Sequence, residues 1–326
     1  MSALVQAAAM RPARHPWSHR RIQVVPMPTV RAINPVRGMP FRWSFNPYRG
    51  CSHACRYCYA RRTHEYLGYN AGGDFDRVIL AKLDAPERLR AELSQPSWRR
   101  DRIAVGTATD PYQPVEGRLR LTRRAIEVFV ERANPISLVT KSTLVMRDRD
   151  LLALLSRRAP GTVVWVTVTT LDRSLARSVE PGAPPPHQRL RAVRELARAG
   201  VPAGILIAPV LPGLTDSEQQ IEELVRVAAE AGACDVGVHP LRLCEGARDV
   251  YRAWLLGYAP RLDRLYDRLY PGGSVNVAAS YHASLSETVT RIKRAIAFPG
   301  EPAVERADDE EGSGAPARAV QLTLGW

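Results

Sequence analysis

Residues 46–59 of this 326-residue chain read NPYRGCSHACRYCY. The stretch holds three of the five cysteines, Cys51, Cys55 and Cys58, in the spacing C-x3-C-x2-C. Thiolates are metal ligands, so three on one short loop can hold one metal centre. A structural zinc usually has four ligands, and the sequence has no second C-x2-C pair. An iron–sulfur cubane held by three cysteines instead leaves one iron open to a small chelating molecule.

The alternatives for the remaining ligands are also visible in the sequence. His53 or His64 would complete a zinc site, and Arg49 and Arg56 are expected to help hold the sulfurs deprotonated. The other two cysteines, Cys234 and Cys244, are interpreted as small core residues, and Cys244 is the one that would face the site.

Outward from this loop, β-rich runs alternate with amphipathic segments rich in Arg, Glu and Leu. Repeated strand-then-helix order predicts parallel strands in an α/β sheet or barrel. Predicted strands cover 102–107, 136–140, 162–169, 202–207 and 235–239. Predicted helices cover 86–93, 122–132, 147–157, 186–199, 217–231, 250–270 and 285–297.

The two ends of the chain have a different composition. Six prolines and scattered arginines in residues 1–40 predict an irregular arm. Residues 41–272 form the predicted core, and 273–326 a C-terminal extension with an acidic linker near 301–314.

Chemistry in parallel α/β folds is found at the carboxyl ends of the strands. The segments at these ends carry polar side chains and one of only three lysines, and they form one candidate site. They are the Cys51–Cys58 loop, Thr107 to Asp110, Thr140 to Ser142, the threonines at 167, 169 and 170, and Ala208-Pro209.

The cysteine loop with Tyr57 before its third cysteine resembles the radical SAM superfamily. The segments NPYRGCSHACRYCYAR, TATDPYQPVE, LVTKSTL and EPGAPPPHQRL resemble its spore photoproduct lyase-like branch, over residues 42–270. The resemblance implies a partial (β/α)6 TIM-like barrel. It also implies a 4Fe–4S cluster that reductively cleaves S-adenosylmethionine to a 5′-deoxyadenosyl radical, which abstracts hydrogen from a substrate.

The resemblance assigns the cluster to Cys51, Cys55 and Cys58 and places Tyr57 near the adenine. It matches Thr109 and Lys141 to contacts with S-adenosylmethionine, and a lysine beside that molecule's carboxylate makes electrostatic sense.

Further cofactor-binding positions follow from the same resemblance. Thr167 matches a hydroxyl of the fourth strand, and Thr169 shares its face because strand side chains alternate. Glu180 and Arg189 match a loop and helix start that shape the cofactor pocket, although Arg189 would equally suit a solvated helix face.

One departure from the branch leaves the substrate open. Spore photoproduct lyase carries a hydrogen-donating cysteine where this chain reads Thr107-Ala108-Thr109-Asp110. Either Cys244 or a tyrosine quenches the product radical, or the substrate differs. We therefore do not assign thymine-dimer repair to this chain on the basis of the resemblance.

The charge of +13 is concentrated at the start of the chain. No acid precedes Glu65, while eleven arginines lie between Arg11 and Arg62. Such an arm predicts contact with nucleic acid through phosphates, or else a solvated segment. The main rival to the enzyme is therefore a zinc-stabilised nucleic-acid-binding protein without catalysis.

The sequence also predicts the cellular location and a redox partner. The chain has no run of about 18 apolar residues, and its cysteines do not form a secreted disulfide framework, so we expect a cytoplasmic protein off the membrane. An electron donor such as flavodoxin or ferredoxin is the expected partner.

Overall fold

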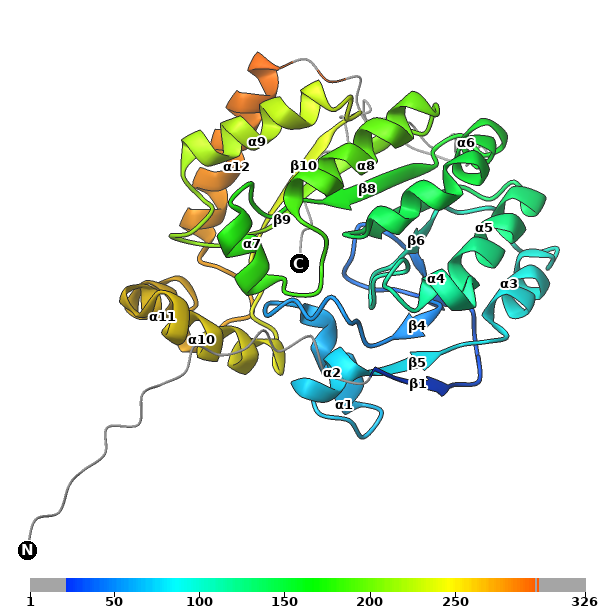
Figure 1. Ribbon diagram of the computed structural model, residues 1–326, viewed down its shortest axis with the longest axis horizontal. Coiled ribbons are helices and arrows are strands. Elements are labelled where there is room, and N and C mark those ends of the chain that lie inside the picture. Colours follow the sequence, from blue (N-terminus) through cyan, green and yellow to red (C-terminus); the bar gives the residue numbers. More distant parts are fainter. Residues whose placement is uncertain (1–21, 297, 299–326) are drawn as a thin grey trace, which may run out of the picture.

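The computed structural model describes residues 22–296 and 298, and within them a seven-stranded sheet organises the chain (Figure 1). Its order is β10-β9-β8-β7-β6-β3-β2, in which all neighbours are parallel except the edge pair β2 and β3. The strands are β2 (Ile33–Pro35), β3 (Trp43–Phe45), β6 (Ile103–Val105), β7 (Ile136–Thr140), β8 (Val163–Thr167), β9 (Ala203–Val210) and β10 (Val236–Pro240). The six parallel strands are those of the predicted partial barrel.

The helices cover the outside of this sheet. Apolar strand residues on that side, such as Val164, Val166 and Ile205, join one large core cluster with the helices. The helices from α3 to α9 are α3 (Ala85–Leu93), α4 (Glu116–Leu119), α5 (Leu121–Arg132), α6 (Arg149–Arg158), α7 (Arg173–Val179), α8 (Pro186–Arg198) and α9 (Glu218–Glu230), with the 3-10 helix η2 (Thr143–Asp148) before α6. A capping box at Ser217 starts α9, as its sequence predicts.

Side chains fill the inner face of the sheet at the end away from the carboxyl ends of the strands. Trp165 packs there with Val163, Cys234 and Leu206. A Cβ atom on Gly204 would lie 2.4 Å from the Trp165 ring, so this position needs glycine. Because side chains alternate, Thr167 follows Trp165 on the same inner face, nearer the carboxyl ends of the strands.

A second, three-stranded sheet carries the start of the cysteine loop. Its order is β1-β5-β4, with β1 (Gln23–Pro26) parallel and β4 (Tyr48–Arg49) antiparallel to β5 (Val78–Ala81). The small helices η1 (Tyr59–Arg61), α1 (Arg62–Glu65) and α2 (Gly73–Arg77) lie between β4 and β5 in the chain.

These pairings correct the prediction of an irregular arm over residues 1–40. β1 and β2 lie in that range, and the prolines inside them sit at strand ends on edge strands, where a missing N–H costs no ladder bond. Residues 1–21 of the arm lie outside the described residues.

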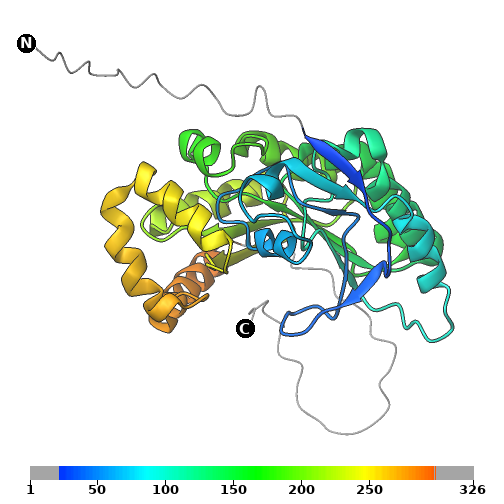
Figure 2. The ribbon, with the colours of Figure 1, turned by 90° about the horizontal axis from the view of Figure 1, so that it is seen from below.

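The C-terminal part also differs in detail from its prediction. Pro260 divides the helix predicted over 250–270 into α10 (Ala247–Tyr258) and α11 (Asp263–Leu269), joined by η3 (Pro260–Leu262). Figures 1 and 2 show α10 and α11, in gold, at one end of the molecule. The short η4 (Pro271–Gly273) precedes α12 (Ala279–Ala295).

Helix α12 belongs to the main core. Its buried residues Leu285, Val289 and Ile292 join the cluster formed by the large sheet and its helices. The predicted boundary at residue 272 therefore does not divide separate cores. The predicted acidic linker lies outside the described residues.

Candidate functional site

The cysteine loop runs from β4 to η1. Cys51 and Cys55 are buried and Cys58 is half-buried. The loop begins at Gly50, whose φ of +76° and close approach to the Val78 carbonyl, 2.6 Å from a would-be Cβ, both require glycine. This sharp start turns the chain from the small sheet toward the carboxyl ends of the barrel strands.

Hydrogen bonds from neighbouring elements hold the loop in place. Thr109 Oγ1 donates to the Gly50 carbonyl at 2.6 Å, and Gln113 Nε2 donates to the same oxygen at 3.0 Å. The fully buried Arg61 donates to the Cys55 carbonyl at 2.9 Å. Because backbone groups of the loop are bonded in this way, the three thiols share a fixed framework.

The segment after α7 holds the loop from the other side. The Arg56 N–H donates to the Val179 carbonyl, and the Gly182 N–H donates to the His53 carbonyl. A Cβ atom on Gly182 would lie 2.1 Å from the Ser52 carbonyl oxygen. Close backbone packing thus joins the cysteine loop to the loop that carries Glu180.

The pKa values of the three thiols depend on burial and on the charges around them. Burial raises the pKa of each, that of Cys55 to about 12, and Cys58 further raises the pKa values of Cys51 and Cys55. Lys141 lowers the pKa of Cys55 and, with Arg61, that of Cys58. The expected roles of Arg49 and Arg56 in this deprotonation stay predictions.

The donor set fits an iron–sulfur cubane better than a zinc ion. Among residues 22–296 and 298, no three His, Cys, Asp or Glu side chains are arranged to hold a single metal ion. The two expected zinc-completing histidines face other groups: His53 Nδ1 lies 3.2 Å from Asp110 Oδ2, and His64 Nε2 lies 2.9 Å from the Val78 carbonyl. Three cysteines on one short loop without a protein fourth ligand are the donor set of a cubane with one open iron.

Four buried side chains form a network beside the thiols. The Tyr57 hydroxyl donates to Glu180 Oε1 and lies 3.1 Å from Thr169 Oγ1, which itself donates to Glu180 Oε1 at 2.8 Å. Arg189 Nη2 lies 2.5 Å from Glu180 Oε2. Arg189 is 1% exposed, so the alternative of a solvated helix face is wrong for this residue.

The network also includes Lys141, at the end of β7. Its Nζ lies 5.6 Å from the centre of the Tyr57 ring. Burial alone would raise the pKa of Glu180, but Arg189 and Lys141 together with hydrogen bonds lower it to about 2. Glu180 is therefore ionised. Arg189 and Lys141 partly neutralise its negative charge beside the thiols.

Asp110 anchors the next strand end. Its carboxylate accepts hydrogen bonds from Thr140 Oγ1 and the Lys141 N–H, both at 2.7 Å, and from the Tyr112 N–H. Burial would raise its pKa, but His53 and these bonds lower it to about 2. Asp110 thus caps a turn and also positions Lys141.

For Thr109 and Thr167, the two remaining predicted residues, the contacts involve backbone carbonyl groups. Thr109 uses its hydroxyl on the Gly50 carbonyl. Thr167 ends β8, and its carbonyl accepts from Arg189 Nη1 at 3.2 Å. The structure therefore brings every predicted site residue to the same end of the barrel as the thiols.

Sequence comparison matches the radical SAM superfamily over residues 45–236. The chain belongs to the radical SAM superfamily. An uncharacterized protein of Mycobacterium tuberculosis is 43% identical over 254 residues, which are 78% of this chain and 74% of that protein. An uncharacterized protein of Methanocaldococcus jannaschii is 29% identical over 203 residues, 62% of this chain and 73% of that protein.

Solved structures give the same answer for the fold of this radical SAM protein. A spore photoproduct lyase mutant with bound AdoMet and dinucleoside spore photoproduct superposes with a TM-score of 0.65 at 20% identity, over 85% of this chain and 80% of that one. The expected barrel is confirmed.

Membership makes this protein a radical SAM enzyme, and the family implies a 4Fe–4S cluster and S-adenosylmethionine. The rival interpretation as a non-catalytic zinc protein is therefore wrong. None of the helices in the described part of this radical SAM protein has the length and apolar character that crossing a membrane requires.

Of two further residues near the radical SAM site, Gln113 was not singled out from the sequence, whereas Cys244 was. Gln113 bridges the Gly50 carbonyl, Thr109 Oγ1 and the Ser52 N–H, but a lone glutamine after a turn gives no signal. Cys244 is buried near Tyr59 and Arg62, just beyond the third cluster cysteine. Its position four residues past β10 was the only hint.

Replacing Lys141 of this radical SAM enzyme by methionine should raise the S-adenosylmethionine concentration needed for half-maximal cleavage about 10- to 100-fold. A charge-assisted bond contributes about 1.5–3 kcal/mol, and its loss weakens binding by that factor. Equilibrium binding of S-adenosylmethionine to the reconstituted protein measures this directly. Lys141→Arg is the control, and equal affinities of wild type and Lys141→Met would exclude the contact.

Proposed function

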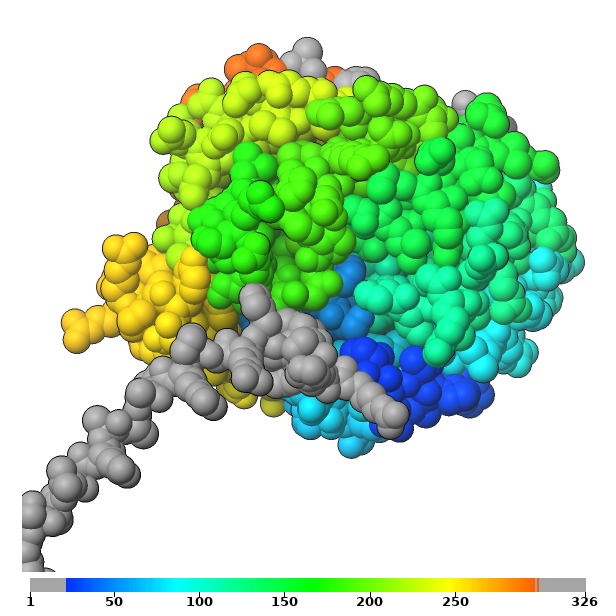
Figure 3. Space-filling model, viewed as in Figure 1, coloured from blue at the N-terminus to red at the C-terminus, as the bar shows by residue number. Residues whose placement is uncertain are grey.

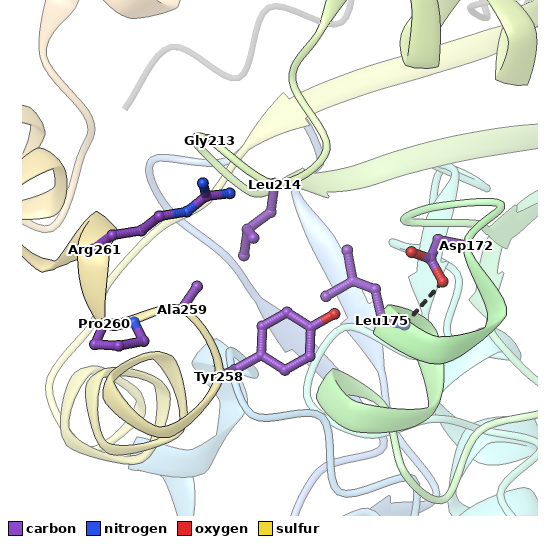
Figure 4. Close-up of a pocket in the computed structure, with 8 residues that line it drawn as sticks. All are labelled: Asp172, Leu175, Gly213, Leu214, Tyr258, Ala259, Pro260 and Arg261. Carbon is purple, nitrogen blue, oxygen red and sulfur yellow. Dashed lines mark hydrogen bonds between the residues drawn. The ribbon is translucent and has the colours of Figure 1, made fainter.

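We propose that this radical SAM enzyme abstracts hydrogen from a nucleotide within a nucleic acid. The observation that carries the proposal is a pocket of about 520 Å³ at the carboxyl end of the barrel. Segments that follow β8, β9 and β10 supply its walls, where substrates of such folds bind. Its lining residues are Asp172, Leu175, Gly213, Leu214, Tyr258, Ala259, Pro260 and Arg261 (Figure 4).

The pocket has the groups that a nucleotide needs. The Tyr258 ring is 41% exposed and stacks on Trp254 with centroids 5.0 Å apart, which leaves an aromatic face for a base. Figure 4 shows the Arg261 guanidinium and the Asp172 carboxylate on opposite sides. Arginine suits a phosphate, and a carboxylate accepts N–H groups of a base.

These groups are free to act on a ligand. Asp172 caps α7 through Oδ1, while its Oδ2 has no hydrogen bond within the described residues. Arg261 likewise makes no ion pair with any described residue. A ligand would therefore gain these bonds without breaking bonds inside the protein.

The pocket adjoins the thiol site. Leu175 belongs to the same buried cluster as Cys55 and Tyr57, and Leu214 and Ala259 pack against that cluster. In Figure 3 the gold atoms of α10 and α11 adjoin the green atoms of α7 on one face of the molecule. The pocket lining and the cysteine loop thus share one apolar cluster.

Two further observations support a nucleic acid. The arm and cysteine loop up to residue 64 carry eleven arginines and no acid, a charge pattern suited to phosphates. The structurally similar lyase mutant was solved with a dinucleoside photoproduct, which shows that this fold accommodates dinucleosides in that protein.

The chain's own residues then have defined tasks. The bound cluster and S-adenosylmethionine would supply the 5′-deoxyadenosyl radical. Cys51, Cys55 and Cys58 would hold the cluster, and Lys141 would bind the carboxylate of S-adenosylmethionine. Tyr57, Thr167, Thr169, Glu180 and Arg189 would shape a water-free pocket around it, which protects a radical from side reactions. A one-electron donor such as flavodoxin or ferredoxin is part of the proposal.

The test follows the hydrogen atom. The anaerobically reconstituted protein is given a strong reductant, S-adenosylmethionine deuterated at C5′, and a set of DNA and RNA oligonucleotides. Oligonucleotide-dependent formation of 5′-deoxyadenosine, with exchange of deuterium into or hydrogen out of the oligonucleotide, supports the proposal. Exchange with a protein or small metabolite, and no stimulation by any oligonucleotide, would contradict it.

Tyr258→Ala should weaken oligonucleotide binding about tenfold. Stacking of one base on an aromatic side chain contributes about 1–3 kcal/mol. Fluorescence anisotropy with a labelled oligonucleotide measures the change. Leu256→Ala is the matched control, because Leu256 is half-exposed on the same helix and does not line the pocket. Equal losses in the two variants would contradict a stacking role.

A further inference from the structure

Lys82 is a buried lysine without a partner. It follows β5 directly and is 5% exposed. Within the described residues its ammonium group makes no hydrogen bond and no ion pair. An unpaired buried charge is costly, and burial together with the nearby Arg49 lowers the pKa of Lys82 to about 8. Such a cost persists in proteins mainly where the group has a function.

Arg49 lies on the same face of the small sheet. In the antiparallel pairing of β4 and β5, Arg49 is opposite Leu80, whereas Tyr48 packs with Ile79 and Ala81 on the other face. Lys82 comes two residues after Leu80 and thus shares the side of Arg49.

The nearest acids are already committed to other groups. Asp84 accepts hydrogen bonds from the Thr29 N–H and hydroxyl, and Glu92 accepts from the N–H groups of Ala32 and Ile33. These four bonds fix the segment between β1 and β2. Both acids raise the pKa of Lys82 through their charge, but within the described residues neither forms an ion pair with Lys82 or Arg49.

Part of each cation remains reachable. Arg49 Nε is fully enclosed and has no hydrogen-bond partner, whereas Lys82 Nζ and the terminal nitrogens of Arg49 are not among the enclosed unpartnered atoms. The two cations lie on one side of the small sheet and are close enough for the charge of Arg49 to lower the pKa of Lys82.

We propose that Arg49 and Lys82 form a binding site for a phosphate group beside the cysteine loop. A guanidinium and an ammonium group together match a tetrahedral oxyanion, since the first donates in a planar fork and the second as a point charge. Arg49 lies two residues before Cys51, so a bound phosphate would border the cluster loop. The site stands on its own contacts and does not require the proposed substrate.

Inorganic phosphate is the first probe, with the reconstituted full-length protein. The unfolding midpoint is measured as phosphate is raised from 0 to about 50 mM while chloride keeps the ionic strength constant. A ligand of the folded state raises the midpoint with its concentration. We expect a rise for the wild type, and at least a tenfold weaker apparent affinity in both Lys82→Met and Arg49→Gln.

A control and a second measurement make the result decisive. Arg88→Gln removes an exposed cation from the neighbouring α3 and should respond to phosphate as the wild type does. Without phosphate, Lys82→Met should be at least as stable as the wild type, because it removes an unpaired buried charge. A phosphate response no larger than that of chloride, or equal responses in all variants, would overturn the site.

An oligonucleotide arm separates the two sources of phosphate. If the site takes a backbone phosphate, Lys82→Met weakens oligonucleotide binding about tenfold and inorganic phosphate competes with the oligonucleotide. If it takes free phosphate, the oligonucleotide affinity is unchanged while the phosphate response is lost. Both results support the site, and failure of the nucleic-acid proposal alone leaves the inorganic phosphate response intact.

Discussion

Cys55→Ala is expected to abolish the cluster and with it all formation of 5′-deoxyadenosine. No other residue of the loop can replace Cys55 as a ligand, because the loop has no fourth cysteine. The neighbouring His53 faces Asp110, and His64 faces the Val78 carbonyl. Two thiols cannot hold three irons of a cubane. The variant should therefore lose the brown colour and the broad absorbance near 400 nm of iron–sulfur centres, with activity reduced by at least about 1,000-fold.

The matched control for this variant is Cys234→Ala. Cys234 is as buried as Cys55 but packs with Val163 and Trp165 inside the barrel, far along the strand from the carboxyl end. It should keep its iron content and its activity. Circular dichroism would show whether each variant folds. A folded Cys55→Ala protein that retains about four irons and cleaves S-adenosylmethionine would refute the assignment of this cysteine.

Much of this fold could be predicted because its signals are local. Five of the six parallel strands contain two or more β-branched residues within a short span, and Gly200 and Gly232 mark the ends of α8 and α9 with positive φ. The spacing of three cysteines fixes the chemistry of the loop without any tertiary information. Strand-end position then brought Lys141 and Thr169 to the same site.

The parts that could not be predicted depend on distant partners. β3 has only three residues, and its sequence WSF gains strand structure by pairing with β6 and β2. Arg189 is one of several arginines on α8, and only the fold shows that it pairs with Glu180. The burial of Lys82 likewise depends on the fold, since nothing in the local sequence marks this lysine after β5 as buried.

Arg189→Met is expected to lower the free energy of unfolding by about 3–5 kcal/mol. The variant leaves the Glu180 carboxylate buried without its cation, and an uncompensated buried charge has a cost of this size. Glu180 is 2% exposed, so water cannot replace the lost partner. The double variant Arg189→Met/Glu180→Gln should recover most of the loss, which urea unfolding of the anaerobic protein would measure.

The acid side of the stability curve gives an independent check on the same pair. The pKa of Glu180 is lowered from 4.5 to about 2 in the folded protein, so its contribution to stability is fully present above about pH 4.5 and is lost as the pH falls toward 2. Without Arg189 the folded pKa rises and this pH-dependent contribution shrinks. Arg189→Met should therefore be destabilised most at neutral pH, and the difference from the wild type should narrow below about pH 4. A difference that stays constant across this range would mean that Arg189 acts through packing alone and that Glu180 is not held as a charged partner.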